Sequence, residues 1–328
     1  MERFEEGPAR RVTARDAVFV VFLAGLILLV LQGPSVRKAG EALSPGVEHD
    51  AVLAVGRPAA WLAERLPFAE ASTRATAFLE PEPNLGGPGG FQSGAGGQLG
   101  AVGPEAFEPA SIGASPPPRR RLRTLLVTGD SMVEPLDFDL AQKLAPRGVH
   151  VIPEAHLGTG ISETYTVNWA KLSAYQVKHD HPEAVVMFIG ANEGFPMPGP
   201  DGREVECCSA AWAAIYANRV RQIADIYRQD GFARVYWITL PTPRDPQRQV
   251  IARVVDAAIP VALAPWAAQV RVIDSVPIFT PGRVYRDAMK LGGVPTIVRR
   301  ADGIHLNEAG SSLLAGYVLA SLSRDFTY

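Results

Sequence analysis

The segment LRTLLVTGDSM, residues 122–132, decides the fold of this chain. Its first part, 122–128, is mostly apolar and is typical of a buried parallel strand. The four residues that follow, 129–132, are good turn formers, so they are also compatible with an ordinary turn. A serine at the C-terminal end of such a strand lies at the rim of the sheet, where open α/β folds bind ligands. Ser131 is therefore the first candidate functional residue.

Apolar segments and amphipathic segments alternate from Leu122 to the end of the chain. This alternation predicts an α/β domain with a parallel sheet covered by helices on both faces. We expect strands at 122–128, 149–152, 184–189, 234–239 and 270–273. We expect helices near 136–144, 163–178, 210–229, 247–268 and 307–323. The stretch 195–205 (FPMPGPDGREV) is predicted to be a polar loop after the third strand.

The N-terminal part predicts a membrane anchor. Residues 17–31 are an uninterrupted apolar run, and residues 17–36 together are expected to form a transmembrane signal anchor. Arg10, Arg11 and Arg15 precede the run, which places residues 1–16 in the cytoplasm and the rest of the chain outside. No convincing cleavage site follows the run, and no cysteine lies directly after it, so we expect neither a cleaved signal nor a lipid anchor.

Composition divides the remainder into three parts. Residues 37–80 are expected to be a short helical segment, with the helix itself over 57–80. Residues 81–120 are rich in Pro and Gly and are expected to be a flexible linker. The glycines there follow no strand and open no helix, so they do not indicate a nucleotide site. Residues 121–328 are then the predicted α/β domain.

Charge and cysteine content exclude several classes of protein. The net charge of −2 over 328 residues argues against a nucleic-acid partner. The only cysteines are the adjacent Cys207 and Cys208, which exclude a disulfide framework and a zinc site of the usual spacing. Such a pair can close into a ring in an oxidising compartment, but we expect two unpaired thiols that face different ways.

Two residues near the C-terminus complete a candidate catalytic group. A serine hydroxyl is a weak nucleophile and needs an adjacent base, for which His305 is the candidate. Asp302 is placed to hold the His305 ring in one tautomer. Taken singly, these residues are equally a helix-start histidine and a turn aspartate. The remaining histidines have no comparable neighbours and are expected at the surface or in loops: His49, His150, His156, His179 and His181.

Acyl transfer also needs hydrogen-bond donors for the developing oxyanion. Three are available at the ends of predicted strands: the backbone N–H of Ser131, the backbone N–H of Gly160, and the side-chain amide of Asn192. A glycine lets the backbone approach a substrate closely. Individually, Gly160 is also compatible with a simple turn, and Asn192 with a helix cap.

Four motifs together resemble the SGNH (GDSL-like) hydrolase superfamily over about residues 120–325: GDSM, the glycine of HLGTGIS, GAN and DGIH. The resemblance implies a three-layer α/β/α sandwich with a flavodoxin-like sheet, a Ser131–His305–Asp302 triad, Gly160 and Asn192 as oxyanion donors, and no metal or cofactor. Gly158 is an alternative match to Gly160. The chain departs from many members at Glu193, where they have Asp.

The N-terminal span, the linker and the helix with Trp212, Tyr216 and Arg219 are similar to a bacterial membrane-anchored branch of that superfamily. The resemblance implies a single-pass protein of the inner membrane with its catalytic domain in the periplasm. The expected function is a serine esterase that removes a short acyl group, acetyl above all, from a small ester or a cell-envelope glycan. One alternative is an O-acyltransferase that works with a multi-span membrane partner, and another is a non-catalytic scaffold.

Overall fold

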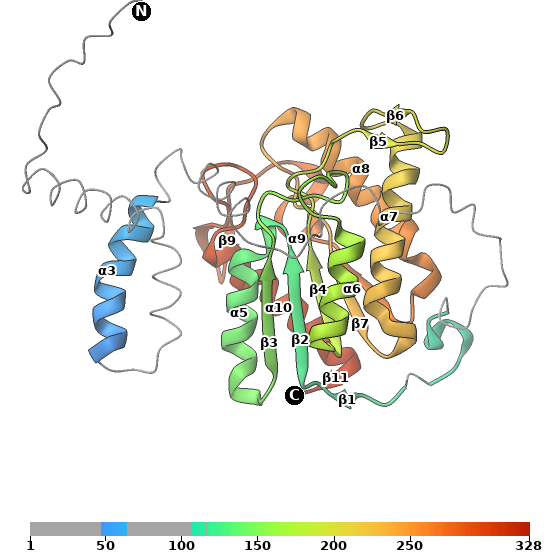
Figure 1. The fold of residues 1–328 in the computed structure, drawn as a ribbon. Helices are drawn as coiled ribbons and strands as arrows, with labels where there is room; N and C mark the ends of the chain where they lie inside the picture. The colour runs from blue at the N-terminus through green and yellow to red at the C-terminus, as the bar shows by residue number, and fades with distance from the viewer. Residues whose placement is uncertain (1–46, 64–106, 116) are drawn as a thin grey trace, which may run out of the picture. The chain divides into compact units, whose positions relative to one another are not determined.

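The computed structural model describes residues 47–63, 107–115 and 117–328. Contacts divide the chain into two compact units, residues 1–72 and 73–328. The larger unit is built on a five-stranded, wholly parallel sheet in the order β3-β2-β4-β7-β8 (Figure 1). Its strands are β2 (Thr124–Gly129), β3 (His150–Ala155), β4 (Ala184–Phe188), β7 (Arg234–Ile238) and β8 (Val270–Ile273). All five predicted strands are present, each within two or three residues of its expected bounds.

Helices cover both faces of this sheet, which gives the expected three-layer α/β/α architecture. Helices α6, α7 and α8 pack side by side on one face, and α5 and α10 pack together on the other (Figure 1). The helices are α5 (Glu134–Leu144), α6 (Trp169–Asp180), α7 (Ala210–Arg228), α8 (Pro246–Leu263), the single turn α9 (Val276–Phe279) and α10 (Glu308–Asp325).

The core follows from this layering. Every residue of β4 is buried, and only the first residue of β2 and of β7 is partly exposed. A strand covered on both faces has to be apolar throughout, which is why these three strands appear in the sequence as continuous apolar runs. The edge strands β3 and β8 are covered less completely, and both contain exposed residues.

The strand order creates a switch point beside β2. From β2 the chain moves to β3 on one side, and then crosses over to β4 on the other side. Ligands in open parallel sheets bind in the crevice at the carboxyl ends of strands where the order reverses in this way. Ser131 follows β2, and Asn192 follows β4, so both candidate residues lie at this point.

Several short elements were not expected from the sequence. The stretch 195–205 contains a small hairpin, β5 (Met197–Pro198) with β6 (Glu204–Val205), and a second hairpin joins β9 (Ala288–Leu291) to β10 (Val294–Ile297). At the other end of the domain, β1 (Arg120–Arg121) pairs in parallel with β11 (Phe326–Thr327). Short 3-10 helices occur at Pro109–Ile112, Ser131–Val133, Ala145–Arg147, Gln229–Gly231, Ala264–Trp266 and Pro281–Arg283.

Helix α6 begins later than the sequence suggested. We expected a helix from residue 163, but Asn168 caps its first turn by accepting a hydrogen bond from the backbone N–H of Lys171. Glu163 is instead part of a turn, where its carboxylate accepts from the backbone N–H of Thr166 at 2.7 Å. Side-chain acceptors of this kind compete with helix formation, and hydrophobic periodicity does not reveal which one prevails.

The smaller unit contributes one described helix, α3 (Val47–Ala63), with Pro58 inside it. This helix begins ahead of the expected start at residue 57. The predicted anchor at 17–36 and most of the linker lie outside the described residues. Among those that are described, only the helical stretch Pro246–Trp266 is long and apolar enough to cross a membrane. That stretch is α8 and the turn after it, which pack on α7 and β8 as a core helix does.

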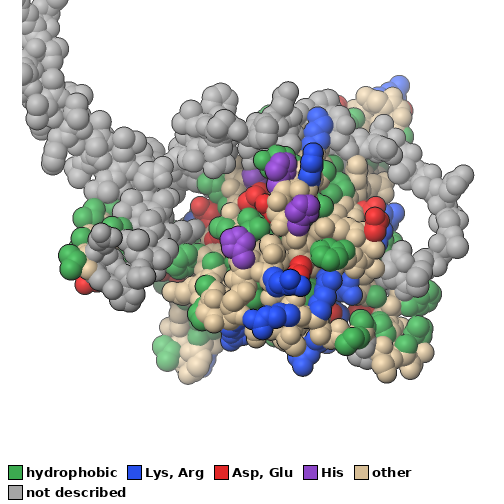
Figure 2. Space-filling view, turned by 60° about the horizontal axis from the view of Figure 1, so that its bottom comes forward, with side chains coloured by type: hydrophobic (Ala, Val, Ile, Leu, Met, Phe, Trp, Pro, Cys, Tyr) green, Lys and Arg blue, Asp and Glu red, His purple; other side chains and the backbone are tan. Residues whose placement is uncertain are grey.

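Basic side chains gather on the face at the N-terminal ends of the strands (Figure 2). Arg121, Arg123 and Arg147 are exposed there, as is His150. Arg123 forms an ion pair with Glu183 at 3.7 Å, and Arg121 donates to the carbonyl of Arg147 at 3.2 Å. Arg119, Arg121 and Arg123 are therefore a solvated flank at the end of the first strand opposite to Ser131, whereas Arg120 is half-buried over the rings of Phe232 and Phe326.

The turn after β2 requires a glycine. Gly129 has φ +153°, and a Cβ atom there would lie 1.9 Å from the backbone oxygen of Phe188 in β4. Gly129→Ala should lower the free energy of unfolding by about 2–4 kcal/mol, because neither backbone can move without breaking the sheet. Urea denaturation of the full chain measures this.

Gly316→Ala is the matched control. Gly316 lies on the exposed side of α10 with no atom within 4 Å of its added Cβ, so alanine should raise the free energy of unfolding by about 0.5–1 kcal/mol. Equal effects of the two substitutions would contradict a close approach at Gly129.

Candidate active site

The candidate nucleophile begins a short helical turn. Ser131 is the first residue of the 3-10 helix Ser131–Val133, and its side chain is 6% exposed. Asp130 caps this turn, because its Oδ1 accepts the backbone N–H of Met132 at 2.9 Å. The backbone N–H of His156, at the end of β3, donates to the carbonyl of Gly129 at 2.8 Å. The serine turn is thus held by its own cap and by a hydrogen bond from the end of β3.

Ser131, His305 and Asp302 form a continuous line of hydrogen bonds. The Oγ of Ser131 lies 2.7 Å from Nε2 of His305, and Nδ1 of the same ring lies 2.7 Å from Oδ2 of Asp302. In the neutral ring Nδ1–H donates to the carboxylate, so Nε2 is left as the acceptor for the serine hydroxyl. The three predicted catalytic residues are therefore brought together, although 174 positions separate Ser131 from His305.

The loop before α10 carries both partners of the serine. Oδ1 of Asp302 accepts the backbone N–H groups of Ile304 and His305, at 2.7 and 3.0 Å. Burial alone raises the pKa of the Asp302 carboxyl, but the hydrogen bond and the charge of His305 outweigh it and hold that pKa well below its ordinary value. Asp302 is consequently ionised throughout the neutral range and stabilises a protonated His305.

Arg299 supports this loop, although no sequence motif marks it. Its side chain is buried, and it donates to the carbonyls of Thr242, Gly303 and Ile304 at 3.2, 3.2 and 2.8 Å. Burial lowers the pKa of Arg299 to about 10, which still leaves the guanidinium charged at neutral pH. A positive charge fixed under the loop favours ionised Asp302.

Asp130 is a second residue that sequence reasoning missed. It is completely buried, and besides capping the serine turn it accepts the backbone N–H groups of Gly190 and Ala191 at 2.9 and 2.7 Å through Oδ2. Burial raises the pKa of Asp130, while these amide hydrogen bonds oppose the rise. One carboxylate thus joins the turn after β2 to the turn after β4.

The two remaining oxyanion candidates lie against each other. A Cβ atom on Gly160 would be 2.9 Å from the backbone oxygen of Asn192, so only glycine fits there. The Nδ2 of Asn192 donates to the carbonyl of Thr159 at 3.2 Å, which leaves one amide hydrogen for a ligand. Gly158 has φ +74° and belongs to the preceding turn. Gly160, and not Gly158, is therefore the glycine that contacts Asn192.

Glu193 fixes the segment that contains Gly160. It is buried, and its carboxylate oxygens accept the backbone N–H groups of Ile161 and Ser162, each at 2.7 Å. The hydroxyl of Tyr216 donates to the same group at 3.1 Å. Burial raises the pKa of Glu193. Arg219 of α7 donates to the carbonyls of Ile161 and Ser162, so both sides of this backbone segment are held.

His156 lies in the loop after β3, in agreement with the expectation of a surface or loop residue, but it is not at the surface. It follows β3 directly, it is only 8% exposed, and its ring packs edge-on against Trp169. Its Nε2 lies 3.4 Å from Oε2 of Glu154, which also accepts a hydrogen bond from Gln176 at 2.6 Å. This polar group lies under α6 and supports β3.

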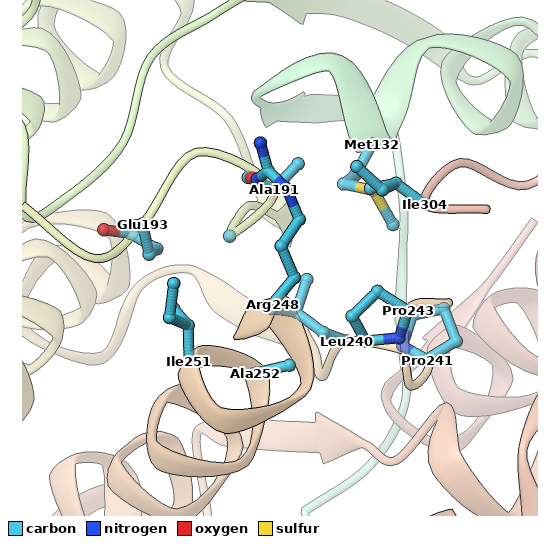
Figure 3. Close-up of a pocket in the computed structure, with 11 residues that line it drawn as sticks. Met132, Ala191, Glu193, Leu240, Pro241, Pro243, Arg248, Ile251, Ala252 and Ile304 are labelled. Carbon is cyan, nitrogen blue, oxygen red and sulfur yellow. The ribbon is translucent and has the colours of Figure 1, made fainter. Parts of the chain in front are cut away.

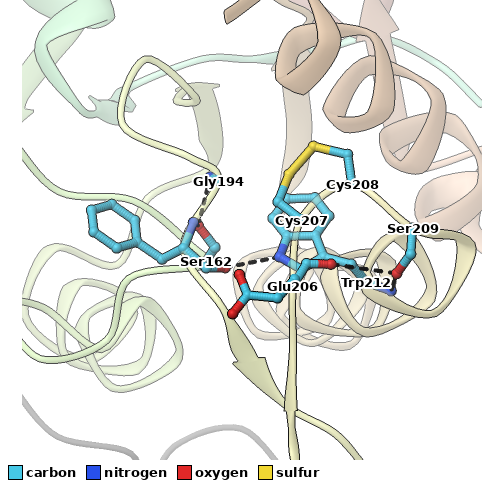
Figure 4. The surroundings of a disulfide bond; sticks show 8 residues. Ser162, Gly194, Glu206, Cys207, Cys208, Ser209 and Trp212 are labelled. Carbon is cyan, nitrogen blue, oxygen red and sulfur yellow. Dashed lines mark hydrogen bonds between the residues drawn. A yellow bond between two sulfur atoms is a disulfide. The ribbon is translucent and has the colours of Figure 1, made fainter. Parts of the chain in front are cut away.

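The expectation that the two cysteines are unpaired thiols was wrong. Cys207 and Cys208 are joined by a disulfide bond, with their Cα atoms 3.2 Å apart (Figure 4). The chain turns here, immediately before α7, and both sulfur atoms therefore lie on the same side. Cys207 packs against the core, and Trp212 below the pair donates from its indole nitrogen to the carbonyl of Phe195 at 2.8 Å.

A small pocket adjoins the catalytic group (Figure 3). Three of its lining residues are direct neighbours of catalytic candidates: Met132, Ala191 and Ile304. The rest come from the end of β4, the end of β7 and the start of α8: Gly190, Glu193, Leu240, Pro241, Pro243, Arg248, Ile251 and Ala252. Its volume of ≈ 20 Å³ is about what one water molecule needs. The described residues contain no cluster of three or more side chains suited to a metal ion.

Glu193→Gln tests the support of the Gly160 segment. Glutamine has one acceptor oxygen, so one of the two backbone amides now bound would face an NH2 group. We expect the free energy of unfolding to fall by about 1–3 kcal/mol in urea titrations. The control Glu204→Gln changes an exposed carboxylate of β6 and should have almost no effect. A loss no larger than that of the control would show that the carboxylate does not hold the segment.

Asp302→Asn tests the ion pair through the pH dependence of stability. The pKa of Asp302 is lower in the folded chain than its ordinary value of 3.8, so ionised Asp302 stabilises the fold above about pH 4, and this contribution disappears as the pH falls through the lowered pKa. The stability difference between wild type and the variant should therefore shrink from pH 6 to pH 2. Glu206→Gln, at an exposed carboxylate, serves as control. If the stability difference between wild type and Asp302→Asn does not change with pH, ionisation of Asp302 does not stabilise the fold.

Comparisons with solved structures find similarities at low sequence identity. No curated protein matches the chain. Among solved structures, a lipase/acylhydrolase from Enterococcus faecalis has 19% identity and a TM-score of 0.41, over 62% of this chain and 97% of that one. The catalytic domain of peptidoglycan O-acetyltransferase A from Streptococcus pneumoniae has 14% identity and a TM-score of 0.39, over 63% and 95%. A member of the lipolytic protein G-D-S-L family from Veillonella parvula has 15% identity and a TM-score of 0.41, over 62% of this chain and 99% of that one.

One family model matches more than half of the chain. It spans residues 124–321, from the first strand of the sheet to the last helix, and so includes Ser131, Asp302 and His305. The chain belongs to the family described as "Protein of unknown function (DUF459)".

Proposed function

We propose that this chain is a membrane-anchored serine esterase of the SGNH type that hydrolyses a short acyl ester. The observation that carries the proposal is the hydrogen-bonded line from Ser131 through His305 to Asp302, with both contacts at 2.7 Å. A nucleophile, a base within hydrogen-bond reach and a third group that orients the base are the parts that acyl transfer requires. Their position at the switch point of the sheet supports the same conclusion.

In the first half of the reaction, the Oγ of Ser131 attacks the ester carbonyl carbon and its proton passes to Nε2 of His305. A C–O bond forms, and the carbonyl π electrons move to the oxygen. When the tetrahedral intermediate collapses, the bond to the alcohol breaks, and the protonated His305 returns the proton to the leaving oxygen. The products are the free alcohol and an acyl group on Ser131.

Three donors stabilise the oxyanion in this proposal: the backbone N–H groups of Ser131 and Gly160, and Nδ2 of Asn192. The close approach of Gly160 to Asn192 and the clamp on the 160–162 segment by Glu193 and Arg219 support it. Donors that are already fixed need no reorganisation when charge develops, and each contributes about a hundred- to a thousand-fold in rate.

In the second half of the reaction, a water molecule attacks the acyl-serine and gives one proton to Nε2 of His305. The acyl C–O bond to Ser131 then breaks, and His305 returns the proton to Oγ. Asp302 remains ionised throughout, because its lowered pKa lies far below the working range. The enzyme is regenerated with the release of one carboxylic acid.

The substrate in this proposal is an acetyl ester, carried by a small molecule or a cell-envelope glycan. The pocket beside Met132 and Ile304 is small, ≈ 20 Å³, which suits a methyl group better than a longer chain. The anchor at residues 17–36 would hold the enzyme at the outer face of the inner membrane, close to such a glycan.

Ser131→Ala tests the proposed function in the full-length chain. The variant should lose at least about a thousand-fold in kcat for 4-nitrophenyl acetate, because the residual rate comes only from the donors and binding. Wild type, but not the variant, should be labelled at Ser131 by a fluorophosphonate probe. Asn192→Ala should keep the labelling but lose about a hundred-fold in rate.

Two results would redirect the proposal. If an added glycan becomes acetylated and free acetate is no longer released, the protein is an O-acyltransferase. A sugar hydroxyl then takes the place of water in the second half of the reaction. Wild type that neither turns over an ester nor reacts with the probe would refute catalysis and leave a non-catalytic scaffold.

A further inference from the structure

The pocket beside the triad contains a cation without a counter-ion. Arg248, in the first turn of α8, extends along the pocket toward the turn after β4 (Figure 3). Its Nη1 donates to the carbonyl of Ala191 at 2.5 Å, and no carboxylate of the described residues pairs with its guanidinium. The side chain is half-buried, so water screens it incompletely.

The acidic groups nearest to this pocket are already engaged. Glu193 lines the pocket, but its carboxylate points away from Arg248 and accepts two backbone N–H groups and the Tyr216 hydroxyl (Figure 3). Asp130 is occupied by backbone amides, and Asp302 by His305. Asp245 caps α8 with its carboxylate on the backbone N–H of Arg248, not on the side chain.

Two further arginines strengthen the positive field at this edge. Arg299 donates only to carbonyls, and Arg244 donates to the carbonyl of Ala301 and the hydroxyl of Tyr285. Within the part of the chain that the structure describes, neither has a carboxylate partner within ion-pair distance. By contrast, Arg283 is paired with Asp256 of α8 at 3.0 Å, and the other oxygen of Asp256 accepts the backbone N–H of Leu240 at 2.8 Å. The catalytic edge thus has more fixed positive than available negative charge.

A guanidinium that uses one donor has four left, arranged as a fork that matches a carboxylate. An arginine that merely supported the turn after β4 would need no apolar cavity beside it. Here Arg248 is itself one of the residues that line the apolar pocket, and the pocket lies next to Ser131, Asn192 and His305. The two features together fit an ester with a small apolar part and an anionic part close to the reacting bond.

We infer that Arg248 is a specificity-determining residue that binds an anionic group, a carboxylate above all, on the ester substrate. This inference rests on the proposed esterase function, and it narrows the substrate class to acidic esters. The pocket itself has room for a short acyl group only, so the carboxylate belongs on the alcohol part, as in an acetylated acidic sugar. A carboxylate at the end of the acyl group is the other source of the same chemistry.

The experiment compares matched pairs of esters with the full-length chain. For the alcohol side the pair is 4-acetoxybenzoate and its neutral methyl ester, and for the acyl side it is 4-nitrophenyl hydrogen succinate and 4-nitrophenyl butyrate. The measured quantity is the ratio of kcat/KM for the anionic ester to that for the neutral one. Because each ratio is taken within one variant, a general loss of folded protein cancels.

Arg248→Gln should lower the ratio about tenfold for the alcohol-side pair, and Arg248→Lys, which keeps the charge but not the fork, should lower it about threefold. The wild-type ratio should also fall as salt is added. Arg253→Gln, at an exposed arginine of the same helix, should leave it unchanged. If Arg248→Gln lowers the ratio tenfold only for the acyl-side pair, Arg248 still binds the carboxylate, but that carboxylate belongs to the acyl group. Equal ratios in wild type and Arg248→Gln for both pairs overturn the inference.

A binding measurement separates this inference from the proposed reaction. In Ser131→Ala, which cannot turn the ester over, 4-acetoxybenzoate should bind at least about tenfold more tightly than its methyl ester by calorimetry. Ser131→Ala combined with Arg248→Gln should abolish that difference. If wild type hydrolyses no ester but this difference is found, the esterase proposal fails while the anion site stands. If hydrolysis is found and the difference is absent, the anion site fails alone.

Discussion

The buried carboxylate of Asp130 is the constraint on which the catalytic edge depends. Its two oxygens accept three backbone N–H groups, one after β2 and two after β4, so that both turns are held at a single point. Without this acceptor, three amides would be buried at the switch point of the sheet with no partner, at a cost of about 1–3 kcal/mol each. The serine turn and the Asn192 turn would then be free to move independently, and a site that needs both would be lost.

A second level of support surrounds this point. Glu193 and Arg219 hold the peptide groups of residues 161 and 162 from their N–H and carbonyl sides, and Arg299 holds the carbonyls of the loop with His305. Each charged group is buried and forms hydrogen bonds to backbone atoms of a loop, which orients that loop. The candidate catalytic residues therefore lie on loops that other side chains hold in place.

The sheet was predictable because β2, β4 and β7 are buried on both faces and therefore appear in the sequence as apolar runs. Local motifs mark three residues of the candidate site, which made them predictable as well: Ser131, Asp302 and His305. Arg299 and Arg219 did not stand out, since a buried arginine that binds carbonyls has no sequence signature. The start of α6 depended on the competition between Asn168 and Glu163 as caps, which periodicity does not report. The Cys207–Cys208 bond depended on the local path of the chain before α7.

The pairing of β1 with β11 brings residues 120 and 326 side by side, at the end of the domain opposite to Ser131. Any polypeptide joined to either end of the domain therefore departs from the same pole. A tether would leave the end of the domain with Ser131 facing outward, and its length would set the radius that this end can reach. For the same reason the two ends could be linked directly and new ends opened in an exposed loop, which makes the domain a natural subject for circular permutation.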